Sequence, residues 1–344
     1  MRFPPPRWLL LAPAALLALA PGALASAFGG PVELSAPAGG FNLLVVGTDS
    51  RAGVTAAEKE RFRLGGQGCD CSDVMMLVHV SARHDRVSVV SLPRDSLAEL
   101  PGPHTVLRTG DVHDSHPAKI NAAHAEGGAQ LTVETVEAAT GIEVHRFLKV
   151  DFRRFMDTVD RIDGGVPICT AKPLKDPSTG LDLAVGTRRV GGGEGLQYVR
   201  SRKADGEMDF GRIRKQHRFI ANALDRIRSD RILRDPRKLA ALTATLRGTE
   251  SAERGISPAE LLRLAARLKR TDLSRFEFAT VPVRGYNPVV EGAGSTVGWD
   301  AEGAAEVFAR IRADRPLPPA EAVAPSAISV ARYAPARGSS LICP

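Results

Sequence analysis

Short apolar runs separated by polar turns recur along the chain, and they predict the strands of a sheet. An apolar run at residues 42–46 leads directly into the polar sequence GTDSR at residues 47–51. Two β-branched runs at residues 74–80 and 87–92 flank a turn at 81–85 and predict a hairpin. Further strands are expected at residues 145–152, 166–169 and 276–283.

Apolar residues at helical spacing predict the helices. After a polar turn, Phe210, Ile213, Ile220, Leu224 and Ile227 recur at this spacing and predict a helix that ends near residue 229. Other helices are expected from residue 119 and at residues 130–140, 153–162, 236–246, 257–268 and 301–312. Because strands and helices alternate, we expect an α/β fold, an αβα sandwich with a mixed central sheet.

Three stretches between these elements lack a regular pattern. Residues 52–72 are polar, residues 101–117 contain His104, His113 and His116, and residues 170–195 are rich in turn-forming residues. The spacing of the three histidines matches no helix or tight turn that joins metal ligands, so we interpret them as part of a solvated loop. The glycines at residues 191–193 and 195 follow no nucleotide-binding fingerprint and are interpreted as a flexible turn.

The N-terminal segment has the pattern of an export signal. Arg2 and Arg7 precede a run without charges at residues 8–27, and Ala23-Leu24-Ala25 resembles a small-residue cleavage site. Residues 1–28 are therefore predicted to be a signal peptide or an uncleaved membrane anchor, and in either case the rest of the chain is exported. A Gly/Pro/Ala-rich linker at 29–40, an extracytoplasmic domain at 41–312 and a Pro/Ala-rich tail at 313–344 are expected to follow.

Composition adds an excess of positive charge to this picture. The 344 residues carry a formal net charge of +7, and 43% of them are hydrophobic. Such a charge favours an anionic partner, which can be a nucleic acid, a lipid headgroup or a phosphorylated substrate. Only 5% of the residues are aromatic, and no alternation of basic and aromatic residues forms a platform for single strands. This disfavours single strands, and the exported N-terminus argues against any nucleic-acid partner, so none is expected.

Four cysteines suit an exported chain. Cys69, Cys71, Cys169 and Cys343 form an even set, which favours two disulfides. A bond between Cys69 and Cys71 would be strained, so each is expected to bond to a distant cysteine. A zinc site is disfavoured because CxC lacks the CxxC spacing of common structural sites.

Most of the candidate chemistry lies at residues 196–216, which read LQYVRSRKADGEMDFGRIRKQ. The first part resembles a strand, which would place Arg200 and Arg202 on one face. On the helix that follows, Arg212 and Gln216 lie one turn apart. We expect these side chains to converge near a helix N-terminus, where an anion with several oxygens binds well.

Three acids and two further cations stand at the ends of predicted elements. Asp49 follows the first strand, Asp73 opens the second, and Asp209 opens the helix. Arg94 follows the strand at 87–92, and Lys119 precedes a helix. Carboxylates that bind a hard cation, together with arginines that bind phosphate oxygens, are typical of phosphoryl transfer.

Six motifs in this order carry a resemblance to a known family. They are GTDSR at 47–51, SDVM at 72–75, SLPRD at 91–95, KINAA at 119–123, YVRSRK at 198–203 and DFGRIRKQ at 209–216. Over residues 41–230 the chain resembles LytR–CpsA–Psr proteins. Lys215 departs from the pattern, because a second arginine often precedes the glutamine in that family.

The resemblance implies an extracytoplasmic, membrane-proximal phosphotransferase of cell-wall biogenesis. Such enzymes move a glycopolymer from a polyprenyl-pyrophosphate carrier onto peptidoglycan, at the 6-hydroxyl of a muramic acid unit, and form a phosphodiester. Wall teichoic acid, arabinogalactan and capsule are all compatible donors. The implied fold has a hydrophobic lipid-binding tunnel, which we expect between the helices at 130–162 and 217–228.

The resemblance also implies roles for the candidate residues. Mg²⁺, with Mn²⁺ as the alternative, would be bound by Asp49, Asp73 and Asp209. The pyrophosphate would be held by Arg94, Lys119, Arg200, Arg202, Arg212 and Gln216. Arg94, Asp73 and Asp209 form the expected catalytic set, in which Arg94 lies closest to the transferring phosphorus. Its high pKa favours charge stabilisation over proton transfer.

Two alternatives differ in class. A basic exported protein could bind lipid-linked or wall-linked anions without turnover, and it would then lose binding but no catalysis when Arg94 is replaced. A transcriptional regulator is disfavoured by the exported N-terminus and by the absence of a helix-turn-helix pattern.

Overall fold

A computed structural model describes residues 40–65, 68, 71–230, 232–246, 248 and 254–344 of the chain. The described residues all belong to the unit Ala36–Pro344. The predicted leader at 1–28 and all but the last residue of the predicted linker at 29–40 lie outside the described residues. Among the helices within those residues, none is long and apolar enough to cross a bilayer.

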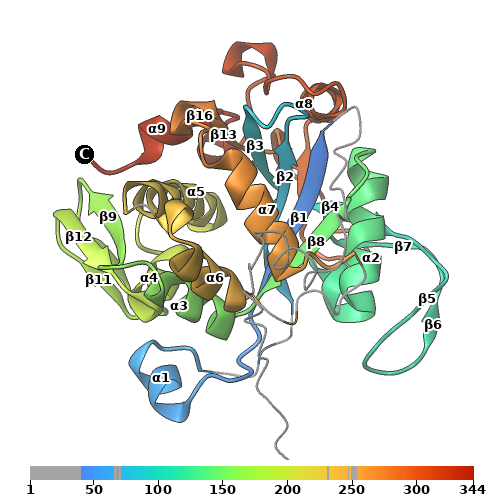
Figure 1. The fold of residues 1–344 in the computed structure, drawn as a ribbon. Coiled ribbons are helices and arrows are strands. Elements are labelled where there is room, and N and C mark those ends of the chain that lie inside the picture. Colours follow the sequence, from blue (N-terminus) through green and yellow to red (C-terminus); the bar gives the residue numbers. More distant parts are fainter. Residues whose placement is uncertain (1–39, 66–67, 69–70, 231, 247, 249–253) are drawn as a thin grey trace, which may run out of the picture. The chain divides into compact units, whose positions relative to one another are not determined.

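A six-stranded mixed sheet lies at the centre of this unit (Figure 1). Its strand order is β16-β13-β3-β2-β1-β8. β1 pairs antiparallel with β2 and parallel with β8, while β3 pairs antiparallel with β2 and parallel with β13. The strands are β1 Phe41–Thr48, β2 Ser72–Val80, β3 Val87–Ser91, β8 Arg146–Val150, β13 Phe276–Thr280 and β16 Ala336–Arg337. The predicted mixed sheet and the hairpin of β2 and β3 are confirmed.

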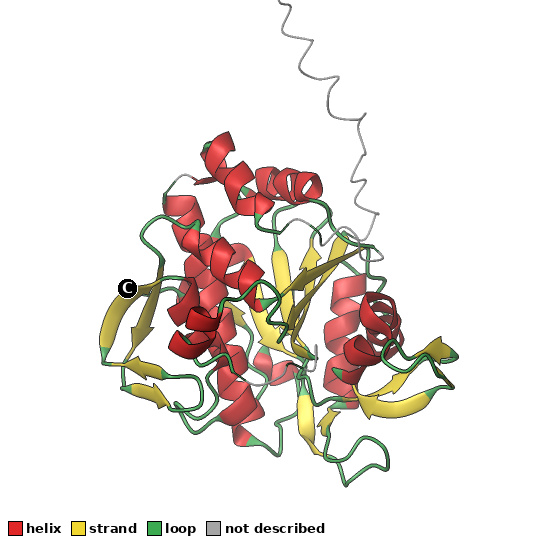
Figure 2. Ribbon diagram, turned by 90° about the horizontal axis from the view of Figure 1, so that it is seen from below, coloured by secondary structure: helices red, strands yellow, loops and turns green. Residues whose placement is uncertain are grey.

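Shorter strands pair outside this sheet, and helices cover it (Figure 2). The short pairs are β4 Leu97–Leu100 with β7 His116–Lys119, β5 His104–Thr105 with β6 Val112–His113, β9 Val166–Thr170 with β12 Gly186–Val190, β10 Leu174–Asp176 with β11 Leu181–Leu183, and β14 Val283–Tyr286 with β15 Val297–Trp299. The helices are α1 Ala56–Arg61, α2 Ala122–Thr140, α3 Phe152–Asp160, α4 Gly192–Arg200, α5 Met208–Ser229, α6 Pro236–Ala244, α7 Pro258–Leu268, α8 Ala301–Arg312 and α9 Gly338–Leu341. Short 3₁₀ turns lie at Ile232–Arg234, Leu273–Arg275, Ala320–Ala322 and Ser329–Ala331.

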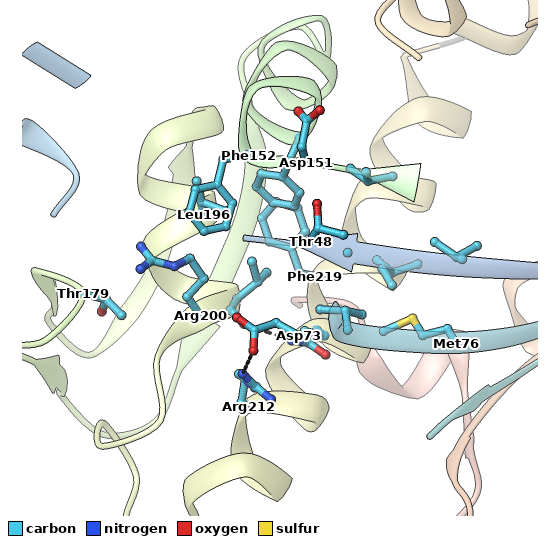
Figure 3. A pocket seen from close by; sticks show the side chains of 18 of the residues that line it. Thr48, Asp73, Met76, Asp151, Phe152, Thr179, Leu196, Arg200, Arg212 and Phe219 are labelled. Carbon is cyan, nitrogen blue, oxygen red and sulfur yellow. Dashed lines mark hydrogen bonds and ion pairs between the residues drawn. The ribbon is translucent and has the colours of Figure 1, made fainter. Parts of the chain in front are cut away.

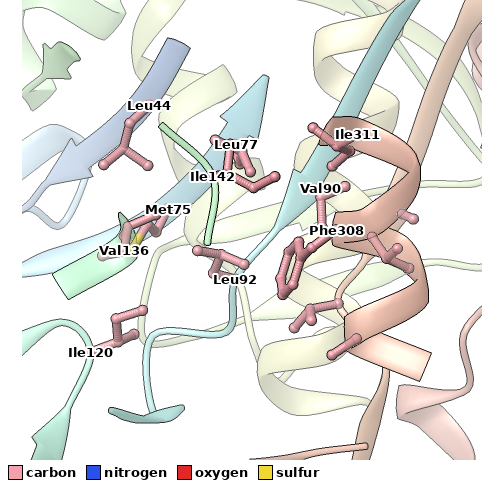
Figure 4. Packing of buried hydrophobic residues seen from close by; sticks show 14 of the residues in the cluster. Leu44, Met75, Leu77, Val90, Leu92, Ile120, Val136, Ile142, Phe308 and Ile311 are labelled. Atoms are coloured by element: carbon pink, nitrogen blue, oxygen red, sulfur yellow. The ribbon is translucent and has the colours of Figure 1, made fainter. Parts of the chain in front are cut away.

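Alternate side chains of β1 and β2 serve two different purposes on the two faces of the sheet. On one face, Leu44 and Leu77 pack with Val136 of α2 and with Phe308 and Ile311 of α8, in a core that Figure 4 shows from close by. On the opposite face, side chains from the same two strands line a cavity that is closed by residues from α3, α4 and α5. The alternation of side chains along each strand thus places the main hydrophobic core on one face of the sheet and the candidate site on the other.

Two predictions are wrong at residues 192–200, which form the helix α4. The segment before Arg200 is not a strand, and the glycines at its start are not a flexible turn. Gly192 and Gly193 are buried in the first turn of this helix, which packs on α3. A Cβ on Gly192 would lie 2.4 Å from the carbonyl oxygen of Met156, and a Cβ on Gly193 would lie 2.1 Å from the ring of Phe62. These glycines are needed for close approach, and the sequence pattern alone does not separate that need from flexibility.

Loops predicted in two other places contain regular structure. Residues 52–72 include α1, whose first turn is closed by a capping box between Thr55 and Glu58. Residues 170–195 include β10, β11 and β12. The histidine loop at 101–117 is mostly exposed, as predicted. It also contains the β5–β6 pair, and the side chain of His104 is only 8% exposed.

The C-terminal tail is packed against the rest of the unit. Leu317 and Tyr333 are buried, the Tyr333 hydroxyl donates to the carbonyl of Pro318 (3.1 Å), and β16 adds a strand to the edge of the sheet. Cys343 forms a disulfide with Cys169 of β9, with 5.5 Å between their Cα atoms. Neither of these cysteines is therefore available to Cys71, and the expected distant partner for Cys71 is wrong. Cys69 lies outside the described residues.

A buried histidine on α5 joins this helix to the sheet and leads to a prediction about pH. His217 lies 2.8 Å from the Ser91 hydroxyl and 5.5 Å from the ring centroid of Phe278. Burial, and to a smaller extent the charge of Arg214, lower the pKa of His217 from 6.5 to about 4. The unfolded chain therefore binds one more proton than the folded chain between these two pH values.

Stability is therefore expected to be complete above pH 6.5 and to fall as the pH drops toward 4. His217 alone should account for about 1.4 kcal/mol per pH unit in this window, or roughly 3 kcal/mol in all. The measurement is urea unfolding at several pH values, with His217→Gln as the comparison. The variant should show a flatter dependence on pH whatever its stability at pH 7. Equal slopes for the two proteins would contradict the assignment.

Candidate functional site

The strand order brings four chain segments to one end of the sheet. β1 ends at Thr48, which pairs with Ser72 at the start of β2, and the Leu92 amide just after β3 donates to Met75 (2.9 Å). Because β2 runs opposite to its neighbours, its first residues lie where β1 and β3 end. The connection between α4 and α5 reaches the same place, since Arg202 and Asp209 both contact residues there. Residues far apart in sequence thus form one cluster.

Arg94 lies between two carboxylates. Its Nη1 is 2.5 Å from Asp73 Oδ1, and its Nε is 3.3 Å from Asp209 Oδ2. Burial alone would lower the pKa of Arg94, but Asp209 and Asp73 outweigh this effect and raise it. The guanidinium therefore remains charged at every pH at which the protein is folded, and it can stabilise negative charge but cannot accept a proton.

Arg202 and Arg212 also contact these two carboxylates. Arg202 Nε lies 2.9 Å from Asp209 Oδ1, and Arg212 lies 3.5 Å from Asp209 and 3.7 Å from Asp73. The Arg212 side chain is 4% exposed, and burial lowers its pKa to about 10. Asp209 keeps a lowered pKa because Arg212, Arg202 and Arg94 outweigh the opposing effect of its burial. Three arginines around two carboxylates leave a net positive centre.

Arg200 is held on an aromatic ring at the edge of this centre. Its Cζ lies 4.9 Å from the ring centroid of Phe152, and Arg51 lies over the same ring at 5.4 Å. Burial, and then the charge of Arg51, lower the pKa of Arg200. Arg200 Nη1 is buried and has no hydrogen-bond partner among the described residues. A buried guanidinium donor without a partner indicates a place for an anionic ligand.

The remaining predicted residues lie at the border of the cluster. Lys119 Nζ is 3.1 Å from Asp95, which in turn lies 3.6 Å from Arg94. Asp49 pairs with Arg51 at 3.0 Å. Gln216 donates from Nε2 to the carbonyl of Val199 (3.1 Å) and also lines the cavity.

Two acids near the cluster have structural roles that the sequence did not indicate. Asp176 accepts hydrogen bonds from the backbone amides of Arg202 (2.8 Å) and Lys203 (3.0 Å) and so fixes the loop that carries Arg202. Ser178 also donates to Asp176 from its hydroxyl and its amide, and these hydrogen bonds together outweigh burial and lower the pKa of Asp176 to about 2. Asp205 pairs with the buried Lys215, so Lys215 is directed to that acid. No motif marked Asp176, whose sequence reads as an ordinary turn.

A cavity of about 420 Å³ extends from the charged cluster between the sheet and the helices (Figure 3). In Figure 3, Asp73 points toward Arg212, and Phe152, Leu196 and Phe219 lie on the other side of the space. Of the helices predicted to form a tunnel, α3 contributes Phe152 and Phe155 and α5 contributes Phe219 and Ile220, while α2 packs into the core on the opposite face of the sheet. The cavity therefore combines cationic and apolar walls.

Comparisons with known proteins find relatives of this chain. Residues 25–312 match the model of the LytR_cpsA_psr family. The probable cell wall biosynthesis protein LcpB of Corynebacterium glutamicum is 30% identical over 284 residues, which cover 82% of this chain and 63% of that protein. The polyisoprenyl-teichoic acid–peptidoglycan teichoic acid transferase TagV of Bacillus subtilis is 30% identical over 194 residues, which cover 55% of this chain and 44% of that protein.

The fold also matches solved structures. The structure of protein gbs0355 from Streptococcus agalactiae superposes with a TM-score of 0.61 at 22% identity and covers 81% of this chain and 89% of that chain. At this level of identity the match concerns the fold alone.

Proposed function

This chain belongs to the LytR–CpsA–Psr family, and from the geometry of its site we propose that it is a phosphotransferase of cell-wall assembly. It moves a glycopolymer from a polyprenyl-pyrophosphate carrier onto peptidoglycan. The observation that carries this proposal is that Arg200, Arg202 and Arg212 line a largely apolar cavity, next to the charged cluster in which Arg94 contacts Asp73. A lipid pyrophosphate needs both surfaces, since its head is anionic and its tail is apolar.

In the proposed reaction an acceptor hydroxyl attacks the phosphorus that carries the glycopolymer. A new P–O bond forms to the acceptor, the bond to the second phosphate breaks, and polyprenyl phosphate leaves. The hydroxyl proton passes to one of the carboxylates of the cluster, Asp73 or Asp209, or to the leaving phosphate. Arg94 stabilises the charge that develops on the phosphoryl oxygens. The glycopolymer is released from the lipid as a phosphodiester of the wall.

We also propose that Asp73 and Asp209 bind Mg²⁺. Phosphate-bound Mg²⁺ usually takes one or two carboxylates together with phosphate oxygens and waters, and these two hard ligands both contact Arg94. When bound, the ion would offset the charge of the pyrophosphate. Asp49 does not gather with them, because in the described part of the chain these three acids form no group within 4.8 Å of one another.

The reaction can be tested with the purified exported unit. The protein is incubated with a polyprenyl-pyrophosphate-linked saccharide, a peptidoglycan fragment and Mg²⁺, and the products are identified by mass spectrometry. We expect polyprenyl monophosphate and a phosphodiester-linked saccharide. Binding of the lipid without cleavage under any metal condition would contradict the enzymatic proposal and favour the binding protein.

The apolar wall of the cavity gives a more specific prediction. Ile220 lines the cavity and is partly exposed, so a tryptophan there would fill space next to Phe219 without entering the core. Ile220→Trp should raise KM for a long-chain donor by roughly tenfold, the equivalent of about 1.4 kcal/mol of lost apolar contact. A donor with a short prenyl chain should be affected much less.

The control for this variant is Val289→Trp, which places the same side chain at a residue that is 80% exposed. It should leave both donors unaffected. An equal loss for long and short donors in Ile220→Trp would indicate that the lipid does not occupy this wall.

A further inference from the structure

Three histidines and a glutamate form a second cluster that the proposed reaction does not use. His104 lies on β5, His113 on β6, His116 on β7 and Glu126 in the first half of α2. Each offers one ligand atom, and these four atoms all lie within 4.8 Å of one another. Nε2 of His104, Nδ1 of His113 and Nε2 of His116 lie 3.3, 3.7 and 3.4 Å from Glu126 Oε2.

These separations fit a tetrahedral metal site. Four N and O ligands at about 2.0–2.1 Å from a Zn²⁺ ion stand roughly 3.4 Å apart at the corners of a tetrahedron. The three measured distances to Glu126 Oε2 are close to this edge length. Imidazole and carboxylate ligands also suit Zn²⁺, and four protein ligands are the number found in its structural sites.

The orientation of two histidines is set by backbone carbonyls. His104 Nδ1 lies 2.8 Å from the carbonyl oxygen of Pro101, and His116 Nδ1 lies 3.0 Å from that of Asp114. A carbonyl can only accept, so Nδ1 carries a proton in each ring, and Nε2 is the nitrogen that faces the carboxylate oxygen of Glu126. In the neutral ring this Nε2 presents a lone pair toward Glu126, as a metal ligand does. A hydrogen bond from Nδ1 to a backbone carbonyl is the usual outer-shell support of metal-bound histidine.

The β5–β6 hairpin has few contacts of its own that would hold it against α2 and β7. The β5–β6 pair is only two residues long on each side, and it extends away from the central sheet beside α2 and β7 (Figure 1). Leu107 and Val112 of this hairpin are 69% and 67% exposed, so apolar burial contributes little to holding it. So short a hairpin is at best marginally stable in isolation. A metal ion would join it to β7 and α2 at one point.

We propose that His104, His113, His116 and Glu126 bind one Zn²⁺ ion, which fixes the β5–β6 hairpin to α2. The site is structural, because four protein ligands fill a tetrahedral shell and leave no open position for a substrate. His113 is 46% exposed, so the ion can enter from solvent. β7 also carries Lys119, three residues after His116, and the site therefore anchors the strand that reaches the phosphate-binding cluster.

The test measures metal content in the full chain purified without an affinity tag. After removal of loosely bound metal, elemental analysis should find one zinc per chain. Replacement of zinc by Co²⁺ should produce the intense visible absorption of a tetrahedral cobalt site. His113→Asn and His116→Asn should each lose the cobalt spectrum and lower zinc affinity at least tenfold, and zinc should raise the Tm of the wild type but not of these variants.

The matched control is His84→Asn, at a histidine that contacts Arg267 and lies outside the cluster. It should keep one zinc and the tetrahedral spectrum. His113 is the most exposed ligand, and its variant is expected to fold, so loss of metal there cannot be ascribed to unfolding. Absence of zinc from the wild type together with no binding of added Zn²⁺, or unchanged binding in both ligand variants, would overturn the proposal. Metal content is read without any transfer assay, so it is independent of the proposed function.

Discussion

Replacing Arg94 with alanine is expected to reduce the rate of glycopolymer transfer by a factor of about 100 to 1,000, the usual effect of removing one donor that stabilises charge in a transition state. Arg94 makes the shortest arginine contact to Asp73, at 2.5 Å from Nη1, and also contacts Asp209 through Nε at 3.3 Å. Its removal takes a fixed positive charge from the centre of the cluster. The loss should appear in kcat more than in KM, because Arg202 and Arg212 remain to bind the substrate.

The conservative variant Arg94→Lys separates charge from geometry. A lysine restores one positive charge but cannot contact two carboxylates with a planar fork, so its activity should lie between those of the alanine variant and the wild type. Arg83→Ala is the control, since Arg83 is 83% exposed and pairs with Asp85 in the turn between β2 and β3, at the opposite end of these strands from Asp73 and Arg94. Transfer is measured by release of polyprenyl phosphate. If Arg94→Ala kept more than half of the activity, the central role assigned to this arginine would be wrong.

Removal of the disulfide should have the largest effect on stability. The bond between Cys169 and Cys343 links residues 174 positions apart and ties the C-terminal segment to β9. A cross-link over a loop of this length restricts the unfolded chain strongly, and its loss typically costs about 4 kcal/mol. We therefore expect the double variant Cys169→Ser/Cys343→Ser to lose about this free energy of unfolding, measured in urea.

A reductant provides the comparison for this experiment. It should bring the wild type close to the stability of the double variant. Adding the same reductant to the double variant measures any effect of the other cysteines, which is then subtracted. A loss below about 1 kcal/mol would mean that the C-terminal segment is held mainly by its packing, through Tyr333 and β16.

The strands and most helices could be predicted because each is specified by its own local pattern. β1 to β3 and α5 show this most clearly, with apolar residues at the period of a strand or a helix. α4 could not be predicted, because its glycines are determined by contact with Met156 and Phe62, which are distant in sequence. A pattern within one segment carries no information about such a contact.

The candidate site, like the fold, could be predicted from the sequence only in part. The sequence placed Arg94, Asp73 and Asp209 at the ends of elements, and the antiparallel order of β1 to β3 then explains why these residues meet. The role of Asp176 could not be predicted, because this carboxylate accepts a hydrogen bond from the backbone amide of Arg202, which lies 26 residues later in a loop. The gathering of the three histidines was not predicted for a similar reason, since the fourth member of the cluster, Glu126, lies on a helix outside the loop.

The continuity of the cationic and apolar walls has a consequence for inhibitor design. Arg200 and Arg212 line the same cavity as Leu196 and Phe219. A simple phosphate mimic would contact only the arginines, which many phosphate-binding enzymes also possess. A purely apolar compound would contact only the apolar side chains. Compounds selective for this pocket are therefore expected to join an anionic head to an apolar tail in one molecule, because such an amphiphile contacts both walls at once.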